Sequence, residues 1–350
     1  MAEFIDDLAN YAFETGATDL FLREGDFPRV RTGGDIDTAS DDRVGVDDLS
    51  AFWRRCGADP DTVTDRDLSY EIAGGRRLRV NLYRSLGQLS AVLRPIEETI
   101  PGFDELGLPA ALLTPWLERY SGIILVTGPT GSGKSTSIAS CLQWVNSRMA
   151  RHIVTIEDPI EYLFHNDKSY FSQREILADT DSFAVALRSS LRQSPDIVLL
   201  GEIRDEESAL IALRAAETGH LVLSTLHSSG VTDTLERLIN LFSPAERESA
   251  LVLLANHLVG ILCQQLLPRN GGGLFLALEH LQNEAVTRKW IRECNLPEIA
   301  DLLHRVDSPA NASFLRHLVA AAEQDILDVE VARAACPNPS DFDRALKGIA

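Results

Sequence analysis

The fold is decided by residues 122–137, GIILVTGPTGSGKSTS. The first half is an unbroken apolar run, which is typical of a strand buried on both faces. Glycines, hydroxyls and a single lysine follow, and residues of these types would make a poor hydrophobic core. The stretch therefore predicts a strand, a glycine-rich turn and the start of a helix, in that order.

The turn matches the phosphate-binding motif G-x-x-x-x-G-K-[ST] in full, from Gly128 to Ser135. Because Gly131 and Gly133 have no Cβ, the backbone can curl and direct N–H groups at phosphate oxygens. The start of the helix adds its positive end. We expect Lys134 to reach the β- and γ-phosphates of ATP and Ser135 to bind Mg²⁺. The predicted nucleotide-binding residues are Gly128, Pro129, Thr130, Gly131, Ser132, Gly133, Lys134, Ser135 and Thr136.

Three more apolar runs follow, and helical patterns lie between them. The runs are HIVTIED (152–158), DIVLLGE (196–202) and HLVLSTL (220–226). Each ends in a polar or glycine-containing turn, as strands buried on both faces do. The pattern predicts an α/β fold whose parallel sheet has helices on both sides.

Acidic residues gather where the predicted strands end. Asp158 and Glu161 follow the second strand, and Glu202 ends the third. Ligands of open α/β sheets lie at the carboxyl ends of the strands. Acidic side chains repel a phosphate, so their position beside one needs an explanation. A bound Mg²⁺ ion would provide it, and so would a water molecule that must be oriented for attack. We expect Ser135, Glu202 and Asp158 to bind the metal; Asp196, before its strand, is expected to be a cap or turn residue.

The fourth strand has a histidine at each end, His220 at its start and His227 at its end. His227, at the carboxyl end, could sense the γ-phosphate or position a neighbouring group. His220 lies at the far end, where a hydrogen bond between elements is the simpler interpretation. The residues alone leave a catalytic and a structural role open for both.

Regions on either side of the sheet complete the predicted organisation. Residues 1–98 mix strand-like pieces (18–24 and 76–85) with a helical one (47–57), which predicts a small α+β domain. A proline-containing linker spans 99–110, and the ATP-binding core spans 111–270. Residues 271–350 are expected to hold a strand at 273–281 followed by helices.

Composition excludes several classes of protein. The net charge is −19, which disfavours broad adhesion to nucleic acid or anionic lipid. No apolar stretch approaches the ~20 residues that cross a bilayer, and the acidic start MAEFIDDLAN is unlike a signal peptide. The five cysteines form no CxxC pair, so neither a zinc site nor a disulfide framework is indicated, and a reducing cytoplasm is expected.

Four segments together resemble one family. GPTGSGKSTS, TIEDPIEY, SSLRQSPDIVLLGEIRD and AAETGHLVLSTLHSS are similar to the Walker A motif, Asp box, Walker B motif and His box of the type II/IV secretion ATPase superfamily (GspE/PilT-like). The resemblance is strongest to the PilT/PilU branch, the ATPases that retract type IV pili. It implies an N-terminal PAS-like domain joined to a RecA-like P-loop core, a hexameric ring, and ATP bound between the two domains and the neighbouring subunit.

The resemblance also implies roles for individual residues. Glu161 matches the glutamate that polarises the attacking water, and Glu202 matches the Walker B acid. His220 and His227 match the two His-box histidines. Arg79 and Arg94 match arginines that approach the γ-phosphate, although a surface salt bridge stays open as their alternative.

The expected activity is therefore ATP hydrolysis that drives pilus retraction and twitching motility, from the cytoplasmic face of the inner membrane. The expected partners are further copies of the chain, an inner-membrane platform protein and a paralogous ATPase, with peripheral membrane association and no nucleic acid. Alternatives are a pilus or secretion assembly ATPase, which usually has a tetracysteine motif that this chain lacks, a PilU-like accessory subunit, and a RecA-like nucleic-acid motor, which the acidity disfavours. The segment 285–294, AVTRKWIREC, matches the corresponding helix of retraction ATPases only loosely.

Overall fold

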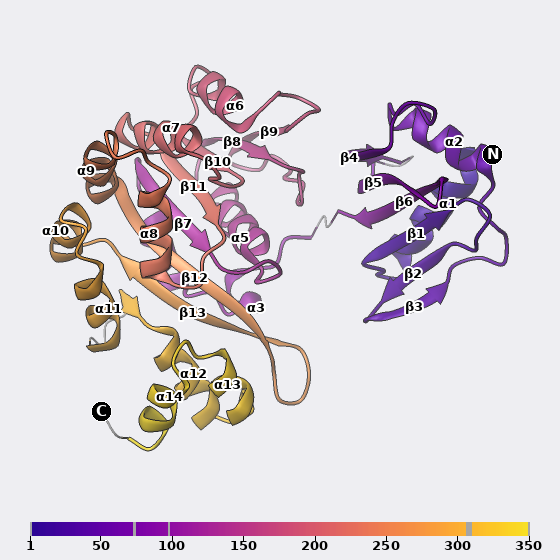
Figure 1. The fold of residues 1–350 in the computed structure, drawn as a ribbon. Coiled ribbons are helices and arrows are strands. Elements are labelled where there is room, and N and C mark those ends of the chain that lie inside the picture. The colour runs from indigo at the N-terminus through magenta and orange to yellow at the C-terminus, as the bar shows by residue number, and fades with distance from the viewer. Residues whose placement is uncertain (1, 73–74, 97–98, 306–309, 349–350) are drawn as a thin grey trace. The chain divides into compact units, whose positions relative to one another are not determined.

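The chain divides into two compact units in the computed structural model, which describes residues 2–72, 75–96, 99–305 and 310–348 (Figure 1). The N-terminal unit comprises Met1–Thr99 together with Asp158–Leu163. The core unit comprises Ile100–Glu157 and Phe164–Ala350. The boundary predicted at residue 98 lies outside the described residues.

The N-terminal unit is an antiparallel sheet covered by two helices that pack against each other and against its central strands. Leu78, Val80 and Leu82 are buried at alternate positions, which confirms the half-buried strand predicted at 76–85. Phe52 and Trp53 fill the core beneath the second helix, within the helical segment predicted at 47–57. In sheet order the strands are β3 (Asp35–Thr38), β2 (Arg29–Thr32), β1 (Asp19–Arg23), β6 (Gln88–Pro95), β5 (Arg77–Ser85) and β4 (Asp65–Glu71); the helices are α1 (Ala2–Glu14) and α2 (Val46–Arg55).

The core unit is built on a larger sheet whose centre is parallel, as predicted. Its strands lie in the order β14-β13-β12-β7-β11-β10-β8-β9, and β12, β7, β11, β10, β8 and β9 run parallel to one another. The four predicted strands are β7 (Gly122–Thr127), β8 (His152–Glu157), β10 (Ile197–Leu200) and β11 (Leu221–Leu226). The structure adds β9 (Tyr170–Glu175) and β12 (Leu258–Pro268), which the sequence analysis does not predict.

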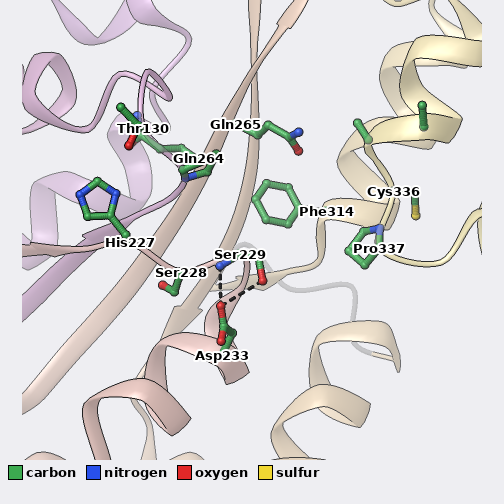
Figure 2. Close-up of a pocket in the computed structure, with 13 residues that line it drawn as sticks. Thr130, His227, Ser228, Ser229, Asp233, Gln264, Gln265, Phe314, Cys336 and Pro337 are labelled. Atoms are coloured by element: carbon green, nitrogen blue, oxygen red, sulfur yellow. Dashed lines mark hydrogen bonds between the residues drawn. The ribbon is translucent and has the colours of Figure 1, made fainter. Parts of the chain in front are cut away.

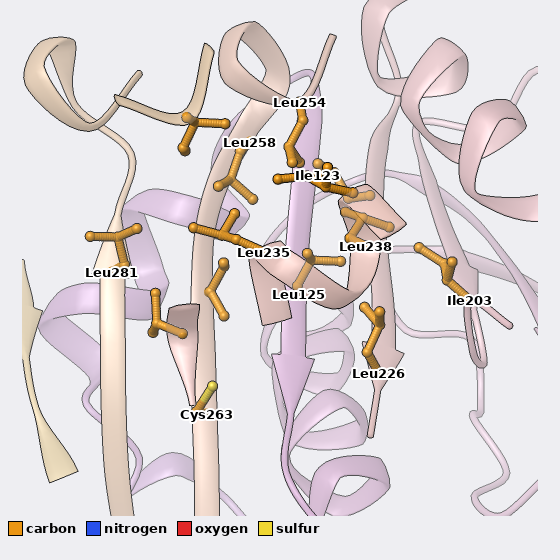
Figure 3. Packing of buried hydrophobic residues seen from close by; sticks show 14 of the residues in the cluster. Ile123, Leu125, Ile203, Leu226, Leu235, Leu238, Leu254, Leu258, Cys263 and Leu281 are labelled. Atoms are coloured by element: carbon orange, nitrogen blue, oxygen red, sulfur yellow. The ribbon is translucent and has the colours of Figure 1, made fainter. Parts of the chain in front are cut away.

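Helices cover both faces of this sheet because its strands are apolar on both faces. Ile123 and Leu125 of β7 face one hydrophobic cluster, whereas Ile124 and Val126 face the other. The first cluster, seen in Figure 3, includes Leu235 and other leucines of the helices that cover its face. Helices α3 (Phe103–Leu106), α4 (Ala110–Leu117) and α5 (Lys134–Asn146) contribute to the second cluster; α6 (Phe183–Ser190), α7 (Glu206–Glu217), α8 (Val231–Asn240) and α9 (Arg247–His257) contribute to the first.

The C-terminal region continues the same sheet before it becomes helical. The strand predicted at 273–281 is β13 (Leu274–Gln282), and it pairs antiparallel with β12 and with the short β14 (Asn311–Ala312). The remaining helices are α10 (Ala285–Arg292), α11 (Leu296–Arg305), α12 (Phe314–Glu323), α13 (Val329–Ala335) and α14 (Pro339–Leu346). Among the described residues, none of the helices combines the length and apolarity needed to cross a bilayer.

Candidate functional site: the phosphate loop and its neighbours

The phosphate loop connects β7 to α5 and depends on glycine at two positions. A Cβ on Gly128 would lie 2.3 Å from the carbonyl oxygen of Gln264 and 2.5 Å from the hydroxyl of Ser132. Gly133, the residue before α5, has a φ of 83°, in the left-handed region. Side chains at these positions would clash or strain the backbone. The sequence therefore folds into a tight turn that leads directly into the N-terminus of a helix, where anions bind favourably.

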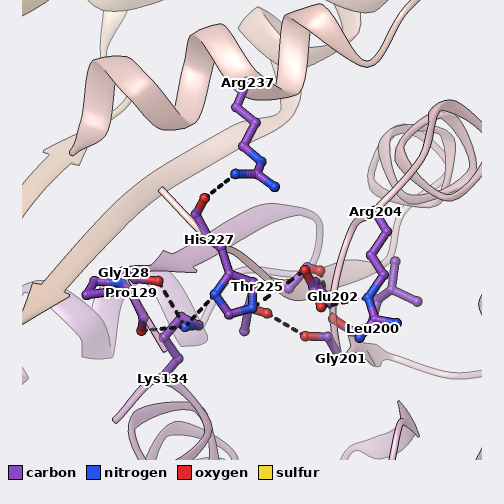
Figure 4. A network of polar contacts seen from close by, with 11 residues as sticks. Gly128, Pro129, Lys134, Leu200, Gly201, Glu202, Arg204, Thr225, His227 and Arg237 are labelled. Carbon is purple, nitrogen blue, oxygen red and sulfur yellow. Dashed lines mark hydrogen bonds and ion pairs between the residues drawn. The ribbon is translucent and has the colours of Figure 1, made fainter. Parts of the chain in front are cut away.

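Lys134 is the cation of this loop and is buried, with 8% of its surface exposed. Its Nζ donates hydrogen bonds to the carbonyl oxygens of Gly128 and Pro129, each at 2.9 Å (Figure 4). The same Nζ lies 3.4 Å from Nδ1 of His227. The loop thus places its positive charge at the end of β7, within reach of the residues that follow the neighbouring strand β11.

Glu202 and His227 meet beside this lysine, because each follows a strand that ends at the same edge of the sheet. Nε2 of His227 lies 3.6 Å from the Glu202 carboxylate, whose side chain is 17% exposed. Nε of Arg204 donates to the other carboxylate oxygen at 2.8 Å. The hydroxyl of Thr225 donates to the carbonyl of Gly201 at 2.6 Å and fastens the ends of β10 and β11 together. Lys134, His227 and Glu202 therefore form one continuous polar network.

The surroundings of His227 favour its neutral form. Burial lowers the pKa of His227 below its ordinary value of 6.5, the charge of Lys134 lowers this pKa further, and Glu202 opposes the shift. Because Lys134 can only donate, the neutral ring accepts at Nδ1 and has its proton on Nε2, toward Glu202. His227 therefore contacts both the lysine of the phosphate loop and the carboxylate of Glu202.

A pocket of about 800 Å³ opens beside this network (Figure 2). One wall is formed by the phosphate loop, by His227 and the serines that follow it, and by Gln264 of β12. The other wall is formed by Phe314 and by residues 334–337 of the C-terminal helical region. Gln264 is fully buried and its Nε2 donates to the carbonyl of Ser132 at 2.7 Å, whereas its Oε1 is buried and has no partner among the residues that the structure describes. The pocket therefore joins the phosphate loop to the C-terminal helices.

The predicted metal ligands Ser135 and Glu202 fit Mg²⁺ chemically. They offer a hydroxyl and a carboxylate, the hard oxygen donors that this ion prefers. The described parts of the chain contain no group of three or more His, Cys, Asp or Glu side chains arranged to hold a metal. Mg²⁺ commonly binds through one or two protein ligands together with substrate phosphates and water, so no larger cluster is required.

His220, at the other end of β11, has different surroundings from those of His227. Its Nδ1 lies 3.1 Å from the carbonyl oxygen of Ala215 and 3.3 Å from the hydroxyl of Thr218. Both partners belong to the end of α7, so the imidazole fastens this helix to the start of the strand. The structure does not bring His220 to Lys134 within the core unit, and its predicted catalytic role stays a prediction.

The other predicted residues belong to the N-terminal unit. Asp158 and Glu161 are exposed and lie in its segment Asp158–Leu163. Arg79 and Arg94 are directly opposite each other on β5 and β6. Their roles toward ATP, and those of the two acids, stay predictions.

Arg94 forms an ion pair within the N-terminal unit. Its Nε donates to the carboxylate of Asp19 at 2.6 Å, and Asp19 is nearly fully buried. Burial tends to raise the pKa of Asp19, but the hydrogen bonds from Arg94 and Thr18, together with the charges of Arg94 and Arg31, outweigh it and lower the pKa. The salt bridge left open as the alternative for Arg94 is therefore present, and 55% of the Arg94 side chain is exposed.

Three residues in or beside the network are not predicted from the sequence. Arg204 lies two residues after Glu202 in GEIRD, and a positive charge so close to a predicted site acid is the pattern that could have indicated it. Gln264 is one of two glutamines in the apolar run LVGILCQQLLP, a polar interruption that marks a buried hydrogen bond once the run is recognised as a strand. Arg237 donates to the carbonyl of His227 at 2.6 Å from the next helix, and no local pattern indicates this contact.

Comparisons with known proteins agree with this architecture. The family model described as type II/IV secretion system protein matches residues 66–295. The chain is 33% identical to the type IV pilus retraction ATPase PilT of Pseudomonas aeruginosa over 347 residues, which covers 97% of the chain and 99% of that relative. It is 33% identical to the type IV pilus ATPase PilU of the same organism over 348 residues, covering 95% of the chain and 89% of PilU.

A solved structure gives the same result at the level of the fold. The crystal structure of the pilus retraction motor PilT with bound ADP matches with a TM-score of 0.89 and 38% identity, covering 97% of this chain and 99% of that one. The predicted fold, an N-terminal domain joined to a P-loop core, is confirmed, and so is the predicted superfamily. The chain therefore belongs to the type II/IV secretion system protein family and is an ATPase of that family.

Proposed function

We propose that this chain is a Mg²⁺-dependent motor that hydrolyses ATP to power the retraction of type IV pili. The observation that carries the hydrolytic part is the network of Lys134, His227 and Glu202 beside the phosphate loop. The likeness to PilT over nearly the whole of both chains, including a relative solved with ADP, supports the nucleotide and the retraction function.

In this proposal the loop from Gly128 to Thr136 holds the phosphates of ATP. Its glycine turn and the N-terminus of α5 supply an anion site, and Lys134 supplies a positive charge at the β- and γ-phosphates. Ser135, Glu202 and Asp158 would hold Mg²⁺, which when bound neutralises charge that develops on the phosphates. Movement of Nζ from the carbonyls of Gly128 and Pro129 toward a phosphate would exchange two neutral acceptors for an anionic one, which favours binding.

The remaining roles concern the attacking water and the transferring phosphoryl group. Glu161 would orient and polarise the water, and Arg79 and Arg94 would offset charge on the γ-phosphate. For Arg94 this requires release of its bond to Asp19. Neutral His227 lies between Lys134 and Glu202. Binding of Lys134 to a phosphate would therefore change the contact of His227 with the Glu202 carboxylate. His220 would act indirectly, by holding α7 and β11 in place.

We further propose that the chain works as a homo-hexameric ring at the cytoplasmic face of the inner membrane. There it would associate peripherally and engage a pilus platform protein, with or without a paralogous ATPase in the same assembly. A PilU-like accessory subunit is the second candidate, because the identity to PilU equals that to PilT, at 33%. An ATPase that drives pilus assembly is a third candidate, against which the missing tetracysteine motif counts.

The test of hydrolysis is phosphate release by the purified full-length chain. We expect turnover that requires both ATP and Mg²⁺, and a chain that releases no phosphate with either Mg²⁺ or Mn²⁺ would contradict the proposal. An accessory subunit would instead hydrolyse ATP only after a partner ATPase is added.

The test of direction is fibre retraction in cells. A deletion strain should assemble pili but fail to retract them, as seen by microscopy of labelled fibres. The wild-type chain should restore retraction, and Lys134→Ala should not. Loss of assembled pili in the deletion strain would support the assembly ATPase instead.

A further inference from the structure

The segment 227–230, which contains His227, is fixed to the helix that follows it. Each of the first three residues of the segment has a partner in the first two turns of α8, so segment and helix form one rigid element. Arg237 donates to the carbonyl of His227 at 2.6 Å, Thr234 shares a 2.6 Å hydrogen bond with the hydroxyl of Ser228, and the carboxylate of Asp233 accepts from the amide of Ser229 at 2.6 Å.

The N-terminus of this helix, and that of α12 in the C-terminal region, lack caps of their own. The residue before α8 is Gly230, which has no side chain to accept a hydrogen bond. The residue before α12 is Ser313, whose hydroxyl is buried, has no hydrogen-bond partner within the described part of the chain and does not cap the helix. The first amides of a helix have no partner inside the helix, so both ends need an acceptor from elsewhere.

One carboxylate supplies both acceptors. Oε1 of Glu279, on β13, accepts from the amide of Val231 at 2.7 Å, and Oε2 accepts from the amide of Phe314 at 3.3 Å. These are the first residues of α8 and α12. A carboxylate at a helix N-terminus is also favoured by the helix dipole, and here one charge lies at two such ends. Glu279 therefore links the N-termini of two helices that begin more than eighty residues apart in sequence.

The linked helices stand on the two sides of the pocket beside the phosphate loop. Ser228, Ser229 and Asp233 line it from the His227 side, and Phe314 lines it from the C-terminal side (Figure 2). Burial raises the pKa of Glu279, while the two backbone hydrogen bonds oppose the shift and favour the ionised form. The Glu279 carboxylate is thus bonded both to α12 and to α8, the helix that holds the segment containing His227.

We infer that Glu279 is a positioning residue that couples helix α12 of the C-terminal region to the catalytic network through His227. The inference rests on the proposed role of His227 in hydrolysis. It adds a connection between the network and the helical region, to which the sequence analysis gives no role.

The first experiment measures ATP turnover by Glu279→Gln in the full-length chain. The amide has the size of the carboxylate but offers one acceptor oxygen, so one helix end loses its cap. We expect kcat to fall about tenfold while KM for ATP changes less than about twofold, because the loop that binds phosphate is untouched. The matched control is Asp328→Ala, which removes the cap of α13 and should leave kcat within about twofold of the wild type.

A double-mutant cycle separates positioning from general destabilisation. Glu279→Gln should cause no further loss of kcat when His227 is already alanine, since both changes then act on the same step. Equal losses in both backgrounds would overturn the inference, and so would an unchanged kcat in the single variant. If His227→Ala itself leaves kcat unchanged, the proposed role of His227 is wrong and the inference falls with it.

A second variant keeps the test decisive if Glu279→Gln does not fold. A Cβ on Gly230 would lie 2.9 Å from Oε1 of Glu279, and the φ of −169° at this position is extended backbone that alanine adopts readily. Gly230→Ala should therefore displace the carboxylate from Val231 without straining the chain. We expect a loss of kcat that His227→Ala again masks; wild-type turnover in Gly230→Ala would overturn the inference.

Discussion

Strands β10 and β11 carry polar residues of the same types at both ends, but the two edges of the sheet use them differently. At the amino edge, Asp196 accepts from the amide of His152 at 2.8 Å and forms an ion pair with Arg151 at 3.5 Å. His220, at the same edge, lies within hydrogen-bond distance of the carbonyl oxygen of Ala215. Each polar side chain at this edge therefore pairs with a backbone group or with a nearby side chain.

At the carboxyl edge, the acid and the histidine contact side chains from other strands. Glu202 follows β10, His227 follows β11 and Lys134 begins the helix after β7, and the three contact one another in series. Parallel strands bring the ends of separate segments together at this edge, whereas the amino edge mainly closes helix-to-strand connections. Residue type alone therefore does not distinguish the two edges, and the comparison predicts that the carboxyl edge holds the catalytic groups and the amino edge the structural ones.

The largest expected difference between the edges concerns one cation at each of them, Lys134 and Arg151. Lys134→Ala should lower kcat about 1000-fold, because it removes a preorganised charge at the phosphates. Arg151→Ala, at the amino edge, should lose stability but keep kcat within about threefold of the wild type. Phosphate release and thermal unfolding of both variants measure the contrast, and comparable losses of kcat would break it.

The acids of β10 give the next contrast. Glu202→Gln keeps the size of the side chain but removes its charge, and kcat should fall about 100-fold. Asp196→Asn, the matched change at the other end of the strand, retains an acceptor for the amide of His152. It should cost less than about 1 kcal/mol of stability and leave turnover unchanged. If Asp196→Asn lowered kcat as strongly as Glu202→Gln, edge location would not identify the catalytic acid.

The carboxyl edge could be predicted because its signals are local. The phosphate loop 128–136 combines a full motif with a strand before it and a helix after it, and Glu202 directly ends an apolar run. Such runs are long enough and apolar enough to predict strands buried on both faces. Because these strands are parallel, the loop and the acid that follow them are predicted to lie at the same edge of the sheet, and no tertiary contact is needed for this prediction.

What the sequence does not predict depends on contacts between distant segments. Strand β12 is not predicted because α9 ends at His257 and β12 begins at Leu258, with no turn residue between them. Gln264 lies on β12 and is therefore not predicted either. Glu279 lies in a strand that is predicted, but its two hydrogen bonds go to helices that are remote in the chain. Side-chain partners of this kind follow from tertiary packing and have no periodic pattern.

The two histidines of β11 give a smaller contrast within one strand. His227→Ala should lower kcat about tenfold, because it breaks the link between Lys134 and Glu202. His220→Ala should lower kcat less than about threefold and cost about 1 kcal/mol of stability, because it removes a hydrogen bond that holds the end of α7. A larger kinetic loss in His220→Ala than in His227→Ala would favour a direct catalytic role for His220.

The smallest expected effect is a pH dependence that distinguishes the same two residues. The pKa of His227 is below its ordinary value of 6.5, so the folded protein favours the neutral ring, which alone can accept from Lys134. As pH falls below about 6.5, the unfolded chain binds a proton at this histidine before the folded chain does. The contribution of His227 to stability is therefore full above this pH and is lost as the pH falls from there through the lowered pKa of the folded state.

Turnover should follow the same titration. The kcat of the wild type should be level near pH 7.5 and fall to about half where the pH equals the lowered pKa of His227, since half of the rings are then protonated. His227→Gln, which does not titrate, should have a lower but flatter profile, and His220→Gln should retain the acid limb of the wild type. An acid limb that survives in His227→Gln but disappears in His220→Gln would assign the titrating group to the amino edge and reverse the comparison.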